Sequence, residues 1–134
     1  MEFITVEQFQ EQPKEIQKVL LDWWQPEAGD IFQFVTVDFN NDDSAIGVLG
    51  SEKQIKITQC GKGEYRTPLF TEGQLRRFIE DKLDMKIQCE IHPLTLDYII
   101  LVKNNSGNKV WMHTGKEDLL QAYWKVACML AKEG

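Results

Sequence analysis

The stretch "FTEGQLRRFIEDKLD" at residues 70–84 decides how the rest of the chain is divided. Thr71 followed three positions later by Gln74 is the pattern of a capping box, in which the two side chains satisfy backbone N–H groups at the start of a helix. Leucine, phenylalanine and isoleucine then recur with helical spacing, and the charged residues lie mostly outside that stripe. The sequence therefore predicts a helix over residues 71–84 with one buried face.

The segments on both sides of this helix have the character of strands. They are rich in β-branched and aromatic residues and are separated by polar turn residues. The predicted strands are residues 31–39, 44–50 and 53–58 before the helix, and residues 86–92, 96–103 and 109–113 after it. Short connections favour antiparallel pairing. Apolar residues on both faces of 96–103 place this strand in the middle of its sheet.

A helical region is also predicted at the N-terminus. Thr5 and Gln8 form another capping box, and Pro13 suits the first turn of a second helix. The apolar residues that follow have helical spacing up to Trp23 and Trp24, which stand just before a Gln-Pro turn. We therefore expect both tryptophans to belong to the core or its rim, in preference to an aromatic platform for a ligand.

The last helix is expected to begin at Thr114, with Glu117 as its capping-box partner. The whole pattern predicts an α+β fold, with antiparallel sheet of about six strands layered with three main helices in the order α-βββ-α-βββ-α. A length of 134 residues fits one globular domain over residues 1–134.

Composition argues against several classes of partner. The 15 Lys and Arg residues against 21 Asp and Glu residues give a net charge of −6, which disfavours binding to nucleic acid. No apolar run approaches the roughly 18 residues needed to span a bilayer, so no membrane role is expected. Three unpaired cysteines and an acidic start without a secretion signal are typical of a cytoplasmic protein.

Few residues offer catalytic or metal-binding chemistry. His92 and His113 are the only histidines, and both stand at predicted element boundaries. Common hydrolase and nucleotide-binding motifs are missing. A zinc site that combines Cys60 and Cys89 with these histidines is an alternative, but structural zinc sites normally show two compact ligand pairs. We therefore predict no catalytic residues, no metal ligands and no cofactor, and the sequence favours a non-enzymatic role without deciding it.

Weak candidates for recognition remain. In "GKGEYR" at residues 61–66, Lys62, Tyr65 and Arg66 could bind an anionic ligand or a nucleotide, although the segment is more simply explained as a flexible loop. Exposed aromatic and arginine side chains are enriched at protein interfaces. The candidate interface residues are Arg76, Arg77, Trp111 and Trp124, although interior packing is favoured for the two tryptophans.

Three segments carry a resemblance to known proteins: "FITVEQFQEQPKEIQKVLLDWWQPEAGDIF", "TPLFTEGQLRRFIEDK" and "KEDLLQAYWKVACMLAKE". They resemble small, mostly uncharacterised proteins of bacteriophages and prophages of Gram-positive bacteria. The resemblance covers about half of the chain and includes no catalytic signature. It implies a phage or prophage origin and a location in the host cytoplasm.

Together these features predict a phage accessory protein that binds another protein, such as a host-takeover or anti-defence inhibitor. A protein that sequesters a small ligand or nucleotide is one alternative, and a small enzyme built from scattered carboxylates and histidines is another. The identity of the partner is left open by the sequence. Self-association into a homo-oligomer is left open as well.

Overall fold

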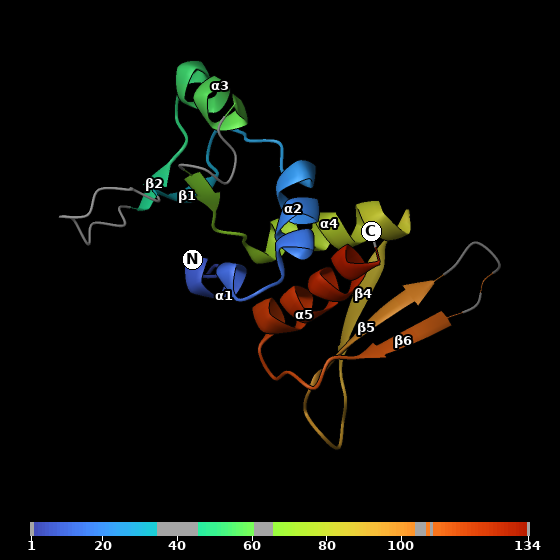
Figure 1. The fold of residues 1–134 in the computed structure, drawn as a ribbon. Helices are drawn as coiled ribbons and strands as arrows, with labels where there is room; N and C mark the ends of the chain where they lie inside the picture. The colour runs from blue at the N-terminus through green and yellow to red at the C-terminus, as the bar shows by residue number, and fades with distance from the viewer. Residues whose placement is uncertain (1, 35–45, 61–65, 104–106, 108, 134) are drawn as a thin grey trace. The chain divides into compact units, whose positions relative to one another are not determined.

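The computed structural model describes residues 2–34, 46–60, 66–103, 107 and 109–133 (Figure 1). These residues form an α+β fold with helices and two separate antiparallel sheets of three strands each. The chain divides into two compact units, the N-terminal unit of residues 5–70 and the C-terminal unit of residues 71–134 together with residues 1–4. That the whole chain acts as one domain stays a prediction.

The N-terminal unit contains α1 (Val6–Gln10), α2 (Lys14–Trp23), β1 (Ile31–Phe34), β2 (Ile46–Val48), α3 (Glu52–Cys60) and β3 (Arg66–Pro68). Its strands have the order β2-β1-β3. Thr5 caps α1 with the predicted box, because its side chain accepts from the Gln8 N–H and Gln8 reaches back. Phe70 lies between two aromatic neighbours, with ring centroids 6.3 Å from Phe9 and 6.4 Å from Trp23.

The tryptophan pair is part of this packing. Trp24 is only 1% exposed, and its indole Nε1 donates to Asp30 Oδ2 at 3.0 Å. The same oxygen accepts from the Glu27 N–H at 2.9 Å, so Asp30 ties the turn to the end of α2. The prediction that Trp23 and Trp24 belong to the core or its rim is confirmed.

The C-terminal unit contains α4 (Glu72–Leu83), β4 (Ile87–Ile91), β5 (Tyr98–Lys103), β6 (Lys109–His113) and α5 (Leu119–Lys132). The strand order β4-β5-β6 confirms the central place of β5. The helix predicted over residues 71–84 is confirmed, since Thr71 and Gln74 form the full capping box. Helices α4 and α5 pack against each other, α4 also contacts β4, and α5 also contacts β5.

Three predictions are wrong. The helix count and order differ from α-βββ-α-βββ-α, because the described residues hold five helices and α3 interrupts the first group of strands. Residues 53–58, expected to be a strand, lie in α3, and β3 takes the third place in that sheet. The last helix does not begin at Thr114. Asp118 caps it by accepting from the Gln121 N–H at 3.0 Å.

The other predicted strands match in position. Residues 31–34 and 46–48 are strands, and the rest of the stretch between them lies outside the described residues. None of the helices in the described parts of the chain is long and apolar enough to cross a bilayer.

Candidate functional site

Strand β6 is the most exposed regular element of the C-terminal sheet. None of its residues is buried, and Val110 and Trp111 remain 48% and 45% exposed. In β5, by contrast, all of residues 99–102 are buried. The helices contact β4 and β5, so β6 extends past the packed layer with apolar side chains on both of its faces.

The outer edge of β6 carries unpaired backbone groups. In an antiparallel ladder, successive residues direct their N–H and C=O groups alternately toward one neighbour and away from it. Thr114 N–H donates to Tyr98 O at 3.2 Å, so residues of the same parity, Met112 and Val110, also face β5. Lys109, Trp111 and His113 therefore direct their N–H and C=O groups outward. Among the described strands only β5 pairs with β6.

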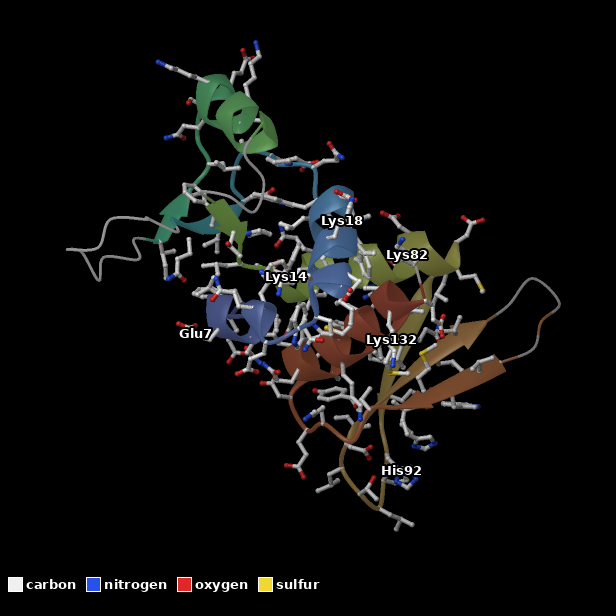
Figure 2. All side chains as sticks on the ribbon, viewed as in Figure 1. Glu7, Lys14, Lys18, Lys82, His92 and Lys132 are labelled. Atoms are coloured by element: carbon white, nitrogen blue, oxygen red, sulfur yellow. The ribbon has the colours of Figure 1, made fainter. Side chains whose placement is uncertain are left out.

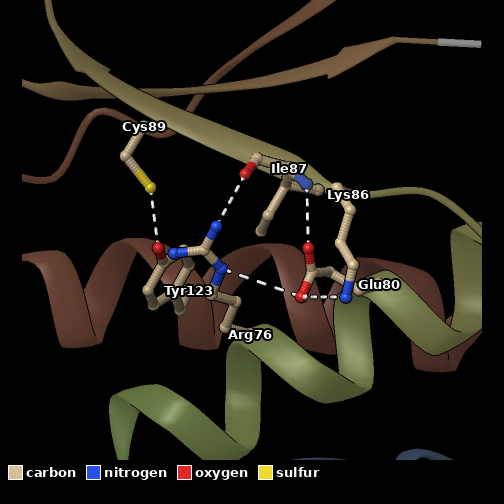
Figure 3. Close-up of polar contacts among 6 residues, drawn as sticks. All are labelled: Arg76, Glu80, Lys86, Ile87, Cys89 and Tyr123. Carbon is tan, nitrogen blue, oxygen red and sulfur yellow. Dashed lines mark hydrogen bonds and ion pairs between the residues drawn. The ribbon is translucent and has the colours of Figure 1, made fainter.

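At the opposite edge of the sheet, side chains of α4 bind the backbone groups of Ile87, the first residue of β4 (Figure 3). Arg76 Nη2 donates to Ile87 O at 3.0 Å, and Ile87 N–H donates to Glu80 Oε2 at 3.0 Å. Glu80 Oε1 also lies 3.7 Å from Arg76 Nε and 3.9 Å from Lys86 Nζ. Natural proteins commonly protect sheet edges in this way. This protection covers the start of β4, whereas all five residues of β6 are solvent-accessible.

The face of the sheet that carries Cys89 is the face toward the helices. Cys89 Sγ lies 2.7 Å from the Tyr123 hydroxyl oxygen (Figure 3). Burial, and secondly the hydrogen bond with Cys89, raises the pKa of Tyr123 above its usual value. This phenol therefore stays protonated at neutral pH and serves as a packed polar contact.

The other face gathers Trp111 with the two histidines. Register places His113 opposite Ile99 and Trp111 opposite Leu101, and both aliphatic residues are only 6% exposed. The rings of His92 and His113 lie 6.1 Å apart, centroid to centroid. Aromatic and imidazole groups therefore line the β6 side of this face.

His92 also has a structural role in the β4–β5 hairpin (Figure 2). Its Nδ1 accepts from the N–H groups of Leu94 at 3.2 Å and Thr95 at 3.3 Å. The neutral ring must then carry its proton on Nε2. His92 consequently acts first as a turn residue, and only Nε2 is available for other contacts.

This hairpin presents a second apolar feature. Ile91, Leu94 and Leu96 are 55%, 87% and 61% exposed, and Leu96 adopts a left-handed φ of 60°, which bulky residues rarely occupy. Asp97 holds the loop by accepting from the Thr95 hydroxyl and from the Gly115 N–H. The Thr95 hydrogen bond is the largest cause of a pKa of Asp97 below its usual value.

The predicted interface residues lie in different surroundings. Trp111 is exposed on β6 and Arg77 is exposed on α4, whereas Arg76 is committed to Ile87 and Glu80. Trp124 is 6% exposed and packs inside, which is the placement that the sequence favours for it. The structure does not bring Trp111 and Trp124 together on one surface.

The predicted ligand residues are tested less directly. Lys62 and Tyr65 lie outside the described residues, and Arg66 is described only as the first residue of β3. The described hollow at the end of α4 is lined by Glu80, Asp81, Asp84, Met85 and Lys86. A hollow rich in carboxylates is unsuited to the phosphates of a nucleotide. A ligand site at 62–66 stays a prediction.

Sequence reasoning named Trp111 but not its neighbours Val110 and Met112. The signal was present, since apolar residues at three successive positions of a strand place apolar side chains on both faces.

The described residues contain no group of three or more His, Cys, Asp or Glu side chains that could hold a metal ion. No protein-family description, curated protein or solved structure matches the chain.

Proposed function

We propose that this protein is a non-enzymatic accessory protein that binds another protein by adding an extended segment of that partner to the edge of β6. The observation that supports the proposal is the open outer edge of β6, whose five residues are all solvent-accessible. Backbone hydrogen bonds at such an edge supply affinity, and alternating side-chain contacts supply specificity.

Trp111 is the proposed anchor of this interface. It is the only large aromatic side chain on β6, and tryptophan is enriched among residues that dominate binding energies. Val110 and Met112 offer apolar contacts on the other face of the added strand. The outward N–H and C=O groups of Lys109, Trp111 and His113 would form the new ladder.

The resemblance to phage and prophage proteins suggests the setting of this interaction. In that setting the partner is a protein of the bacterial host, and the bound segment is masked in the host cytoplasm, as in host takeover or anti-defence. Masking requires no reaction at the interface. Sequestration of a nucleotide through Lys62, Tyr65 and Arg66 remains the alternative, but no observed contact favours it.

The proximity of His92 and His113 favours a second candidate, a small enzyme. Its histidines would act as acid and base on the open face of the sheet. Against this candidate, His92 Nδ1 is already occupied by two backbone N–H groups. A His92→Gln/His113→Gln double variant separates the two functions, because it removes acid–base chemistry and leaves the backbone edge of β6 intact.

The proposal is tested by retention of a host protein from a lysate of Gram-positive cells. Tagged wild-type protein is compared with Trp111→Ala, which removes the side chain, and with Trp111→Pro, which also removes an outward N–H group. Proline is tolerated at a strand edge when its nitrogen faces outward. Circular dichroism and thermal unfolding establish that both variants are folded.

We expect one host protein at stoichiometric amount with the wild type, reduced amounts with Trp111→Ala, and none with Trp111→Pro. The double histidine variant should still retain it, because the backbone edge of β6 and Trp111 are unchanged. Equal retention by wild type and Trp111→Pro would exclude strand addition. A nucleotide that copurifies in place of a protein would favour sequestration.

A further inference from the structure

The segment around β6 has a charge opposite to that of the whole chain. Residues 109–116, "KVWMHTGK", include Lys109, His113 and Lys116 and no acidic residue, although the protein has a net charge of −6. Lys125 adds a further cation at the end of the strand, where its Nζ donates to Thr114 O at 2.8 Å. The candidate edge is therefore a basic segment on an acidic protein.

The acidic residues near this segment lie beyond the strand or away from its outer edge. Glu117 and Asp118 directly follow Lys116, after the end of β6, and Asp118 caps α5. Asp97 already accepts from Thr95 and from the Gly115 N–H. Glu90 lies on β4, opposite Ile99, so β5 stands between it and β6. With strands about 4.8 Å apart, Glu90 is roughly 10 Å from the β6 backbone. Neither carboxylate lies on the outer side of β6.

We propose that the segment recognised by β6 is an extended peptide in which two acidic residues bracket three apolar residues. The proposal rests on strand addition as the function of β6 and adds the chemistry of its partner. Directly opposite residues of an antiparallel pair lie on the same face of the sheet. One residue of the partner therefore lies opposite Trp111. The partner residues two positions before and two positions after it lie opposite Lys109 and His113.

Each position of the partner follows from this register. One acidic side chain of the partner forms an ion pair with Lys109. The other accepts a hydrogen bond from the imidazole N–H of His113. An apolar or aromatic side chain packs on Trp111. The two intervening residues face Val110 and Met112, which are apolar, so they are apolar as well. The sequence pattern is acid, apolar, aromatic or apolar, apolar, acid.

A second copy of the chain fits this edge less well. Antiparallel pairing of β6 with itself, centred on Trp111, places Lys109 opposite His113 at both ends. That arrangement supplies no acidic side chain to either residue. It also brings together two molecules that each carry a net charge of −6, and like charges resist association.

The test uses the full chain, labelled with nitrogen-15, and two synthetic peptides at millimolar concentration. One contains Glu-Val-Phe-Val-Glu and the matched control contains Lys-Val-Phe-Val-Lys, both flanked by glycine. Hydrogen exchange is measured at each amide of β6. Strand addition protects the outward amides of Lys109, Trp111 and His113, while those of Val110 and Met112 are already bonded to β5.

We expect the acidic peptide to protect the outward amides and to bind about tenfold more tightly than the lysine peptide, with the difference decreasing at high salt. A Lys109→Glu/His113→Glu variant should reverse this preference. The reversal also shows that the charge of these positions, and not folding, determines the choice.

Equal protection by both peptides would overturn the acidic preference while leaving strand addition intact. Absence of protection by the acidic peptide would overturn the inference as well, and the Trp111→Pro retention experiment then decides the proposed function independently. Protection that increases with protein concentration without peptide would identify a second copy as the occupant, and the inference would be wrong.

Discussion

At the scale of single residues, Gly47 shows how closely the backbone of β2 approaches a buried ring. A Cβ atom at this position would lie 2.7 Å from Phe32 Cζ, and Phe32 is only 2% exposed. A buried ring has little room to move, because protein interiors are close-packed. The glycine is therefore required by packing and not by backbone conformation.

We predict that Gly47→Ala destabilises the protein by about 1–3 kcal/mol, the usual cost of overpacking. Gly73→Ala is the matched control, since a methyl group at this position of α4 would meet no atom within 4 Å and alanine favours helices. The control should be neutral or stabilising by up to about 1 kcal/mol. Urea denaturation of both variants measures the difference, and equal stability of the two would contradict the packing argument.

Cys128 gives a prediction of pH dependence. Burial raises the pKa of this thiol from its usual 9.0 to about 12. The folded protein therefore keeps a proton that the unfolded chain loses. The stabilisation from the neutral thiol is complete below about pH 9 and is lost as the pH rises through about 12.

We expect Cys128→Ala to lose less stability than the wild type when the pH is raised from about 8 to about 10.5. The difference is at most about 1.4 kcal/mol per pH unit, and less here because the thiol is partly exposed. Urea denaturation under reducing conditions measures it. Parallel pH curves for the two proteins would show that the thiol does not titrate differently on unfolding.

At the scale of elements, local patterns assigned one helix to a strand and misplaced the start of another helix. Residues 53–58 were assigned to a strand because Ile55 and Ile57 alternate with polar residues, but six residues are too few to distinguish the two periods. Ser51 precedes them, and its Oγ accepts from the Gln54 N–H at 3.2 Å. This is the same relation that Thr71 and Gln74 show at α4, and it marks the start of α3.

The start of α5 shows the opposite error. Thr114 and Glu117 have the spacing of a capping box, yet Thr114 is 1% exposed and donates its hydroxyl proton to Tyr98 O at 2.6 Å. A tertiary contact with β5 therefore overrides the local signal. Asp118 takes over the cap, four residues later.

The cap of α5 can be tested with adjacent acidic residues. Asp118→Ala should destabilise the protein by about 1 kcal/mol, because the Gln121 N–H loses its acceptor. Glu117→Ala removes the same charge without removing the cap, so its effect should stay within about 0.5 kcal/mol. Thermal unfolding compares the two variants. A larger loss of stability with Glu117→Ala than with Asp118→Ala would instead support a capping box of Thr114 and Glu117.

At the scale of the whole molecule, the candidate site depends on where the helices stop. The sequence identified Trp111 as an interface candidate but favoured interior packing for it, and Val110, Trp111 and Met112 give no alternation that would fix its face. Exposure of β6 follows from α4 and α5 packing over β4 and β5, which is a property of the assembled unit. The edge protection by Arg76 and Glu80 likewise joins residues far apart in sequence and has no local signal.

Trp24 and Trp111 allow the effects on stability and on recognition to be measured separately. Trp24 is 1% exposed and bonded to Asp30, whereas Trp111 is 45% exposed. Trp24→Ala should therefore destabilise the protein by about 3–5 kcal/mol, as expected for loss of a buried aromatic ring. Trp111→Ala should change the free energy of unfolding by no more than about 1 kcal/mol while weakening partner retention. Urea denaturation and the retention assay on the same preparations measure both effects. A large loss of stability in Trp111→Ala would mean that the ring stabilises the sheet and is not available to a partner.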